Sequence, residues 1–305
     1  MAIFHLGHRS IMRLIGTRDE TNGPIAFLQD ILTADIASLG AGQMRQSCLL
    51  SPQGRILVEM GIYIPMQKSD EECLYIACDA SQAEELLKKL KLYRLRRKIT
   101  LEMCENLTLI AYDDGADTDM KGLQIITNAP DERAPNRGHH AIITKQSLPT
   151  VTLGDYDSYL ACRLLDAIPE GPDELTPNRA LMLEAGLELF DAVDFKKGCY
   201  IGQEVTARTR YRGLVKRRLV PVTGAGLIAG GSIMSDDKQV GSILATAAFK
   251  DAMVGLASIR LSAIHDAEAG AVLQIDGLAE DLADGLAIAL AIPDHLRPLP
   301  KAEAK

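Results

Sequence analysis

The sequence contains no apolar run that approaches the about 18 residues needed for a membrane-spanning helix. Its N-terminal stretch, residues 1–17, lacks the continuous apolar core and the small-residue cleavage site of a secretory signal. The chain also lacks an excess of positive charge, because its formal net charge is −8 and its isoelectric point is near 5.3. A general attraction to nucleic acid or to an anionic membrane is therefore excluded, and we predict no membrane partner.

Paired cysteine motifs are absent as well. None of the six cysteines forms a C-x-x-C motif, so the sequence predicts neither a zinc site nor a disulfide framework. Cys48, Cys73 and Cys78 lie in apolar runs typical of strands, and we expect them to be buried. Free cysteines suit a reducing compartment, which we predict to be the cytoplasm. His139 and His140 lie in a polar stretch that predicts a solvated loop and not a metal site.

The hydrophobic pattern predicts a mixed α+β fold. The 305 residues, of which 47% are apolar, suffice for two or three packed units. The expected strands cover 9–17, 44–50, 55–66, 72–79 and two runs within 98–114, and the expected helices cover 24–32, 80–96 and 156–169. Short β-like runs from residue 214 onward predict an all-β barrel. We therefore expect a mixed region at 1–213, a barrel at 214–295 and a solvated tail at 296–305.

Two basic runs stand out from this acidic background. Residues 88–98 and 208–218 hold seven and six Lys or Arg within eleven residues. Each run is either a solvated face of a helix or strand, or a local site for an anion. Each contains one aromatic residue, Tyr93 or Tyr211, which provides no stacking platform for bases. We therefore predict no direct binding of nucleic acid.

The stretch 196-KKGCYIGQEVTARTRYRG-213 carries the chemistry of the sequence. From Gly202 its composition predicts a short helix, which places Cys199 just ahead of a helix N-terminus. Lys196 and Lys197 add positive charge, so we expect this thiol to ionise more readily than a free cysteine. Such a thiolate is able to attack an electrophile, ligate a soft metal or form a mixed disulfide. The alternative is a buried structural thiol.

Two readings also stay open for the residues that follow the cysteine. Gln203 and Glu204 are able to cap the predicted helix and point into a pocket. Glu204 and Arg208 lie four residues apart, which equally suits a surface ion pair.

The run K-G-C-Y-I-G-Q-E at 197–204, followed by Arg208 and 212-RG-213, closely resembles the signature of a known family. It is that of the folate-binding YgfZ/Iba57 proteins, which are related to the T-protein (aminomethyltransferase) of glycine cleavage. Four further segments are similar to motifs of this family: 26-AFLQDILTADI-36, 49-LLSPQGRIL-57, 163-RLLDAIP-169 and 184-EAGLEL-189. The resemblance covers nearly the full length of the chain.

This resemblance implies a T-protein-like fold, in which α+β subdomains surround a central channel that binds tetrahydrofolate or a derivative, with a C-terminal β-barrel. It implies a role in the assembly or repair of iron–sulfur clusters, including those of tRNA-thiolating enzymes. The implied partners are folate and iron–sulfur proteins or assembly factors. Cys199 would be the reactive residue, and the implied cofactor-binding residues are Lys197, Tyr200, Gly202, Gln203, Glu204, Glu184 and Arg208.

The alternative function is a folate-dependent one-carbon transferase or demethylase of the T-protein kind. The T-protein has G-G-x-x-D-D after its first hairpin, with a carboxylate that acts on the folate nitrogen, whereas this chain has Val58 and Glu59. Strand alternation turns Glu59 away from the face of Val58, so we expect no true aminomethyltransferase activity. Leu165 replaces the T-protein glutamate that pairs with the pterin, which leaves that role to Glu184 or another group.

A further hypothesis concerns the arginines of the second basic run. Natural folates often carry anionic polyglutamate tails. Arg208, Arg210 or Arg212 would receive such a tail or an acidic surface of a partner.

Overall fold

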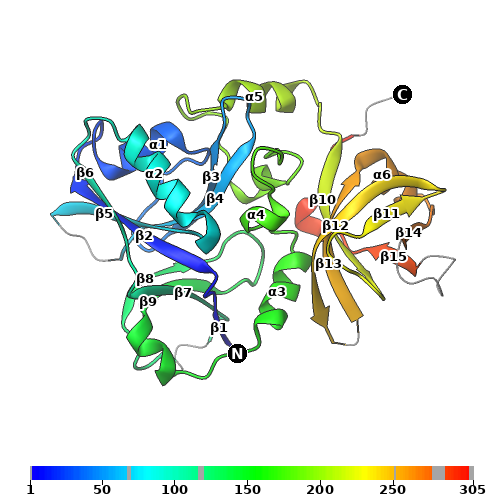
Figure 1. Ribbon diagram of the computed structural model, residues 1–305, viewed down its shortest axis with the longest axis horizontal. Coiled ribbons are helices and arrows are strands. Elements are labelled where there is room, and N and C mark those ends of the chain that lie inside the picture. The colour runs from blue at the N-terminus through cyan, green and yellow to red at the C-terminus, as the bar shows by residue number, and fades with distance from the viewer. Residues whose placement is uncertain (1, 67–69, 116–119, 251, 277–285, 302–305) are drawn as a thin grey trace. The chain divides into compact units, whose positions relative to one another are not determined.

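The computed structural model describes residues 2–66, 70–115, 120–250, 252–276 and 286–301 (Figure 1). The chain forms two compact units, and each takes two separate stretches of the sequence. The first unit comprises residues 1–156 and 190–203, and the second comprises residues 157–189 and 204–305. The signature stretch therefore begins in one unit and ends in the other.

A five-stranded antiparallel sheet forms the centre of the first unit. In the spatial order β3-β4-β5-β2-β6 its strands are Met44–Leu50, Ile56–Tyr63, Glu71–Asp79, Arg9–Thr17 and Ile99–Met103. Helices α1 (Pro24–Ile31) and α2 (Ala83–Tyr93) pack their apolar residues on one face of this sheet. Alternate strand residues such as Val58, Met60 and Ile62 complete that core, as the two-residue period of a strand requires.

A four-stranded antiparallel sheet completes the first unit. In the spatial order β1-β7-β9-β8 its strands are Ile3–His5, Leu107–Tyr112, His139–Thr144 and Ile125–Pro130. The predicted solvated loop at His139 and His140 is wrong, because both residues belong to β9 and His140 is buried. Its ring bonds to the hydroxyl of Tyr63 at 2.8 Å and lies 3.5 Å from Asp131 Oδ2, so the polar ring is satisfied inside the unit.

The second unit contains a closed six-stranded barrel. In the spatial order β10-β13-β12-β11-β14-β15 its strands are Arg217–Gly224, Ala252–Arg260, Lys238–Phe249, Ser232–Ser235, Leu273–Asp276 and Leu286–Leu290. Val222 of β10 pairs with Gly255 of β13 and with Leu290 of β15, which closes the ring and removes its edges. The unit is not purely β, because helix α6 (Leu261–Glu268) follows β13 and buries Leu261 and Ile264.

Residues 157–189 of the second unit are held by two buried arginines. Helix α3 (Tyr156–Leu165) carries Arg163, which binds both carboxylate oxygens of Glu174 in helix α4 (Gly171–Glu174) at 2.7 and 2.6 Å. Arg218 of β10, only 2% exposed, donates to Glu188 at 2.7 Å and to the carbonyl of Leu183. The pair Arg163–Glu174 thus holds α3 and α4 together, and the pair Arg218–Glu188 joins residues 157–189 to the barrel.

The described C-terminal residues are packed within the second unit. Leu296 is buried, and Arg297 pairs with Glu268 of α6 at 2.7 Å.

The prediction of an α+β fold with antiparallel sheets and a C-terminal barrel is confirmed. Within the described ranges, no helix combines the length and the apolarity that a bilayer crossing demands.

Candidate functional site

The signature stretch begins with a turn that is fixed by Asp194. The Asp194 carboxylate accepts hydrogen bonds from the backbone N–H groups of Lys196 and Lys197 at 2.5 and 2.9 Å. The backbone N–H of Asp194 donates to the carbonyl of Thr33, just after helix α1, at 2.9 Å. An aspartate that bonds its own following backbone is a common way to hold a turn. The loop that carries Cys199 therefore starts from a fixed point of the first unit.

Lys197 holds the same loop through its side chain. Its Nζ donates to the carbonyls of Leu32 and Ala34 at 2.8 and 2.7 Å, and lies 5.5 Å from the centre of the Tyr200 ring. Burial lowers the pKa of Lys197 to about 8, although nearby carboxylates, first that of Asp35, oppose the shift. The ammonium group is thus engaged with backbone oxygens and does not face the neighbouring thiol as a free charge.

Thr33 fastens the segment after α1 to both sides. Its hydroxyl donates to the carbonyl of Ala192 at 2.6 Å and accepts from the backbone N–H of Cys48 in β3 at 2.9 Å. Thr33 belongs to the segment 26–36 that is similar to a family motif, but that similarity predicted no role for it. Its signal was a small polar residue inside a mostly apolar run, a pattern that favours side-chain bonding to the backbone.

Gly202 brings a third segment of the resemblance into contact. Its φ is +82°, and a Cβ at this position would lie 2.6 Å from the carbonyl oxygen of Ser51 and 3.1 Å from Gly54 Cα. The turn at 51–55 therefore packs directly against the loop, and only glycine fits. Gly198 has no such constraint, since nothing lies within 4 Å of its Cβ position. Three segments that are distant in sequence, 26–36, 49–57 and 194–203, meet in the first unit.

Cys199 is exposed at the outer side of this braced loop. The alternative of a buried structural thiol is therefore wrong. The next residue, Tyr200, is only 7% exposed, and its buried hydroxyl has no hydrogen-bond partner among the residues described. Burial raises the pKa of Tyr200, and Asp194 raises it further. An accessible sulfur thus lies beside a buried aromatic residue on a loop that is fixed at both ends.

The remaining predicted residues of the stretch lie in helix α5 (Gln203–Tyr211), with Gln203 and Glu204 in its first turn and Arg208 in its last. Gln203 donates from its backbone to Tyr200 at 3.3 Å and from its amide to Gly198 at 3.4 Å. Glu204 and Arg208 are exposed and belong to the second unit. The described side chains form no ion pair between Glu204 and Arg208, so the four-residue spacing is not used in that way.

Glu184 belongs to the second unit, where it lines a cleft with a volume of about 280 Å³. Leucine side chains line this cleft together with Arg217, Ser242 and Ser258. Arg217 donates to the hydroxyl and the carbonyl of Ser258 at 3.0 and 2.8 Å. Within the described part of the chain, the carboxylate of Glu184 has no hydrogen-bond or ion-pair partner. The predicted residues therefore separate into a loop set in the first unit and a set formed by Glu184, Glu204 and Arg208 in the second.

Glu59 is buried on the opposite face of β4 from Val58, as strand alternation predicted. It is 2% exposed, accepts from both terminal nitrogens of Arg9 at 2.8 and 3.3 Å, and accepts from Gln46 at 3.1 Å. Val58 points instead into the core beneath α1 and α2. The carboxylate of Glu59 is thus a structural ion-pair partner.

The other cysteines differ in their burial. Cys48 and Cys78 are buried as predicted, Cys73 is half-buried, and burial raises the pKa of all three thiols. Cys162 of α3 is exposed. Over the ranges that the structure describes, no group of three or more His, Cys, Asp or Glu side chains is arranged to hold a metal ion.

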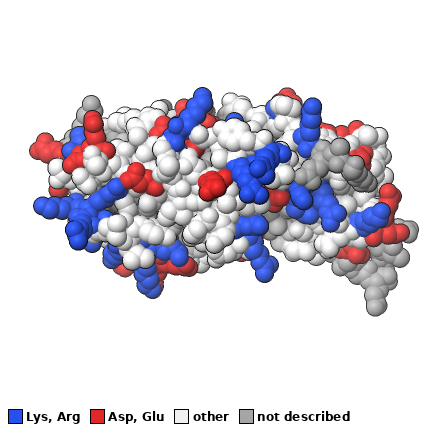
Figure 2. All heavy atoms as spheres, turned by 90° about the horizontal axis from the view of Figure 1, so that it is seen from above, with Lys and Arg blue, Asp and Glu red and all other residues white. Residues whose placement is uncertain are grey.

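The two basic runs differ in how far their charges are used. In the first, Lys89 pairs with Glu85 at 3.2 Å and Arg97 pairs with Asp30 at 2.5 Å, which fits a solvated face. In the second, Arg217 and Arg218 turn inward, whereas the arginines of α5 remain exposed. Basic and acidic side chains are interspersed over the surface seen in Figure 2.

The fold defines the class of protein. It is similar to that of the glycine cleavage system aminomethyltransferase T from Bartonella henselae, with a TM-score of 0.73 over 96% of this chain and 85% of that chain. The sequence identity is 14%, so this likeness concerns the fold alone. Residues 216–298 match the family described as CAF17, C-terminal beta-barrel domain. The chain is thus a T-protein-like α+β protein with a CAF17-type barrel.

Relatives in sequence define the family. The chain is 31% identical over 264 residues to the human mitochondrial iron–sulfur cluster assembly factor IBA57, covering 78% of this chain and 72% of that protein. It is 34% identical over 210 residues to the IBA57 homolog of Pyricularia oryzae, covering 66% of this chain and 53% of that protein. The chain belongs to the family of IBA57 iron–sulfur cluster assembly factors. It spans little more than half the length of such fungal relatives, with 57% for that of Chaetomium globosum.

The predicted cytoplasmic location is overturned by these relatives, which are named as mitochondrial proteins. The prediction was based on free cysteines and the lack of a disulfide framework. Those features indicate a reducing environment, but they do not distinguish one reducing compartment from another.

Proposed function

We propose that the chain is an accessory protein for the assembly or repair of iron–sulfur clusters, in which Cys199 binds the cluster during its transfer between proteins. The observation that carries this proposal is the exposed Cys199 on a loop held by Lys197, Thr33 and Gly202. Thiolates are the usual cluster ligands, and a cluster usually takes four of them from protein. One exposed thiolate therefore suits a shared site, in which a partner protein supplies the other ligands and the cluster is cargo.

Two features of the loop support a transfer role over a storage role. Among the described residues, Cys199 belongs to no group of three or more His, Cys, Asp or Glu side chains that could hold a metal ion. The side chains of Lys197 and Tyr200 are also turned into the first unit, whereas Cys199 in the same loop is exposed. A ligand that is single and accessible is able to exchange with the ligands of another protein, because no enclosing set of donors must open first.

The experiment that tests this proposal compares Cys199→Ala with Cys162→Ala, the other exposed cysteine. Each variant is expressed in a strain that lacks the endogenous assembly factor, and the activity of cluster-dependent enzymes is measured. We expect loss of rescue with Cys199→Ala and full rescue with Cys162→Ala. Full rescue by Cys199→Ala would show that cluster assembly does not need this thiol.

We further propose that the protein binds tetrahydrofolate or a derivative, with Glu184 as the group that accepts the pterin edge. The residues fit such a ring. The carboxylate of Glu184 lines a cleft of about 280 Å³ together with leucine side chains, two serines and Arg217, whose positive charge interacts with it. A carboxylate is well suited to accept two parallel hydrogen bonds from an amino-substituted heterocycle. The likeness of the fold to an aminomethyltransferase adds support.

The folate proposal is tested by titration calorimetry with tetrahydrofolate on the intact protein. Glu184→Gln keeps the size of the side chain but replaces one accepting oxygen by a donor, so we expect at least a tenfold loss of affinity. Glu105→Gln makes the same change at an exposed position outside the cleft, so it is the control and should change affinity little. Equal affinity of wild type and Glu184→Gln would remove Glu184 from the folate site.

The alternative transferase function loses support from the position of Glu59. Its carboxylate is buried and bonded to Arg9 and Gln46, so it is not within reach of a substrate nitrogen. We expect no methylene-folate from an aminomethylated donor and tetrahydrofolate. Formation of methylene-folate that depends on Glu59 would restore the transferase function.

We also propose that the client proteins include enzymes that thiolate tRNA. Mass spectrometry of nucleosides from a strain without the factor should then show reduced thiolated bases, restored by wild type and not by Cys199→Ala. Unchanged thiolation in the deletion strain would exclude these clients.

A further inference from the structure

Helix α5 has almost no fully buried side chains. Of its nine residues, Thr206 is the only buried one. Tyr211 is 75% exposed, and Val205 and Leu214, just beyond the helix end, are each 39% exposed. Apolar and aromatic side chains on a helix normally face a core, so these three residues are without the contacts that such side chains usually make.

Such a helix should have little stability of its own. Helix nucleation is costly, and in proteins most helical stability comes from the packing of an apolar face. Helix α5 nevertheless has an ordered end: the N–H of Leu214 bonds to Thr209 at 3.1 Å, and that of Gly213 bonds to Arg210 at 3.2 Å. These two hydrogen bonds, together with Gly213 at φ +62°, form a Schellman motif. The sequence thus specifies a helix with a defined end but leaves its side chains without a core.

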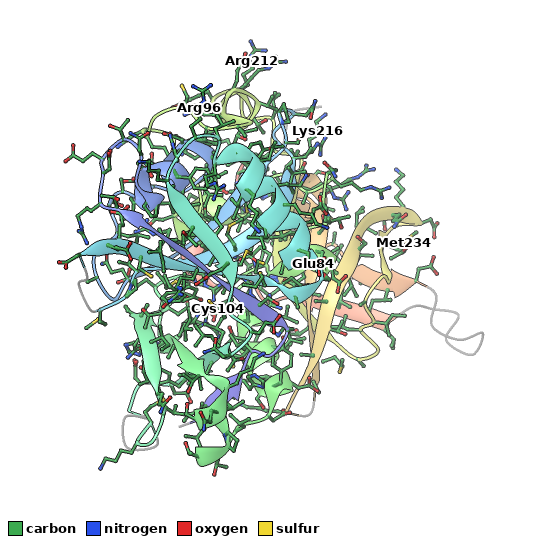
Figure 3. The ribbon with its side chains drawn as sticks, turned by 60° about the vertical axis from the view of Figure 1, so that its left-hand side comes forward. Glu84, Arg96, Cys104, Arg212, Lys216 and Met234 are labelled. Atoms are coloured by element: carbon green, nitrogen blue, oxygen red, sulfur yellow. The ribbon has the colours of Figure 1, made fainter. Side chains whose placement is uncertain are left out.

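The exposed side of α5 has a consistent chemistry. Val205, Arg208 and Arg212 follow the i, i+3, i+7 spacing of one helix face, and Tyr211 lies three residues after Arg208. Figure 3 shows Arg212 projecting away from the ribbon. Arg208, Arg210, Arg212 and Lys216 are all exposed, with Glu204 as the one acidic residue of the helix. This local positive charge contrasts with the net charge of −8 of the chain.

We propose that the outward face of α5, formed by Val205, Arg208, Tyr211 and Arg212, is the docking surface for an acidic, cluster-carrying partner protein. This inference rests on the proposed function, because it names the kind of partner from which Cys199 would receive a cluster or to which it would pass one. Tyrosine and arginine are the residue types that most often dominate protein–protein interfaces. Positive charge complements an acidic partner and speeds its association.

The same features disfavour the other occupants of this face. A polyglutamate tail would use the arginines but has no apolar group to cover Val205 and Tyr211. Nucleic acid would need a stacking platform of several aromatic residues, and α5 offers Tyr211 alone.

The test uses the full-length protein and purified acidic iron–sulfur carrier proteins, each loaded with its cluster. Binding is measured by calorimetry at two salt concentrations for wild type, for Arg208→Glu/Arg212→Glu, and for Tyr211→Ser, which leaves the charge unchanged. The matched control is Lys91→Glu/Arg96→Glu, which makes the same change of charge at two exposed positions of the first basic run. Circular dichroism confirms that each variant is folded.

We expect at least one acidic carrier protein to bind wild type in a salt-sensitive manner. Affinity should fall at least tenfold in Arg208→Glu/Arg212→Glu and several-fold in Tyr211→Ser, and should be unchanged in the Lys91/Arg96 control. Hydrogen exchange at the amides of α5 should slow when the carrier is added. Cys199→Ala should bind the carrier as wild type does but should not take up its cluster.

Equal affinity of the α5 variants and wild type would overturn the docking surface. The proposal would also be overturned if these variants kept their affinity for the carrier protein and lost affinity for another ligand. The other ligands tested are tetrahydrofolate pentaglutamate, tRNA and vesicles of phosphatidylcholine and phosphatidylglycerol. Cluster uptake by Cys199→Ala at the normal rate would instead refute the role of the thiol and leave the docking surface intact.

Discussion

At Gly202 the chain combines a positive φ with direct contact to the turn at residues 51–55. An alanine there would suffer from both the left-handed backbone and the overlap with the Ser51 carbonyl. We expect Gly202→Ala to lower the free energy of unfolding by about 2–4 kcal/mol. Gly198→Ala is the matched control and should cost less than about 0.5 kcal/mol, because its Cβ position is open. Urea unfolding measures both values, and equal costs would contradict the contact.

Lys197 should make stability depend on pH in the alkaline range. Its pKa is lowered to about 8 by burial, from an ordinary value of 10.5, so between these two values the unfolded chain binds more protons than the folded one. The free energy of unfolding therefore gains a contribution that rises from about pH 8 to about pH 10.5 and is absent below pH 8. Lys197→Met should remove this rise. It should also destabilise the protein by about 1–3 kcal/mol at pH 7, since two buried carbonyls lose their donor.

Urea unfolding of wild type and Lys197→Met from pH 7 to pH 10 checks this expectation. The difference in the free energy of unfolding should widen as the pH increases. A constant difference over the whole range would mean that Lys197 titrates as an exposed lysine does.

At the scale of single residues, the sequence singled out Cys199 and Gly202 but not the residues that hold their loop. Cys199 and Gly202 were predicted from the signature, and the structure gives both a defined setting. The contacts of Lys197 with Leu32 and Ala34 could not be predicted, because they join residues far apart in the chain. The same holds for the bond between Tyr63 and His140, which depends on two sheets meeting inside one unit.

At the scale of elements, a buried ion pair spans the central sheet. Arg9 at the start of β2 reaches Glu59 in β4 across the intervening strand β5, and also donates to the carbonyl of Ala77 in β5 at 2.8 Å. Glu59→Gln leaves the buried guanidinium without a countercharge, so we expect a loss of about 3–5 kcal/mol. The double variant Arg9→Met/Glu59→Leu should cost less than Glu59→Gln alone, because no buried charge is left uncompensated.

Urea unfolding of Arg9→Met, Glu59→Leu and the double variant tests the coupling between these two residues. A double variant that loses the sum of the two single losses would show that the residues act independently.

The strands and helices with a clear period were predictable, and those without one were not. Residues 9–17 alternate in burial along β2, and the strand was predicted with the same bounds. Strand β9 was missed because it begins in a polar stretch and is buried through specific partners for its histidines. Helix α6 was missed because eight residues between strands of a barrel resemble a loop in composition. Local pattern thus predicts elements that bury one face, and it fails where burial depends on a distant partner.

At the scale of the whole molecule, the interleaved course of the chain decides which fragments are able to fold. The barrel strand β10 carries Arg218, whose buried guanidinium is paired with Glu188 and with the Leu183 carbonyl. The N–H of Leu219 also donates to the carbonyl of Glu184 at 3.0 Å. A fragment of residues 214–305 lacks these partners and should be unfolded or molten. A fragment of residues 157–305 keeps them and should be folded.

Thermal unfolding and proton–nitrogen NMR spectra of the two fragments compare these outcomes. A cooperative transition in the 214–305 fragment would show that the barrel does not need the segment 157–189.

The first unit is built from two separate stretches of the chain, and this has a consequence for folding during synthesis. The ribosome completes residues 1–156 first, yet the first unit also needs residues 190–203. At about 5–20 residues per second, the nascent chain waits roughly 2–9 s before the cysteine-bearing loop emerges. During that delay the carbonyls of Leu32 and Ala34 have only water as a partner, since Lys197 has not yet been made. A message cut short before codon 190 would therefore yield a polypeptide that quality-control proteases degrade.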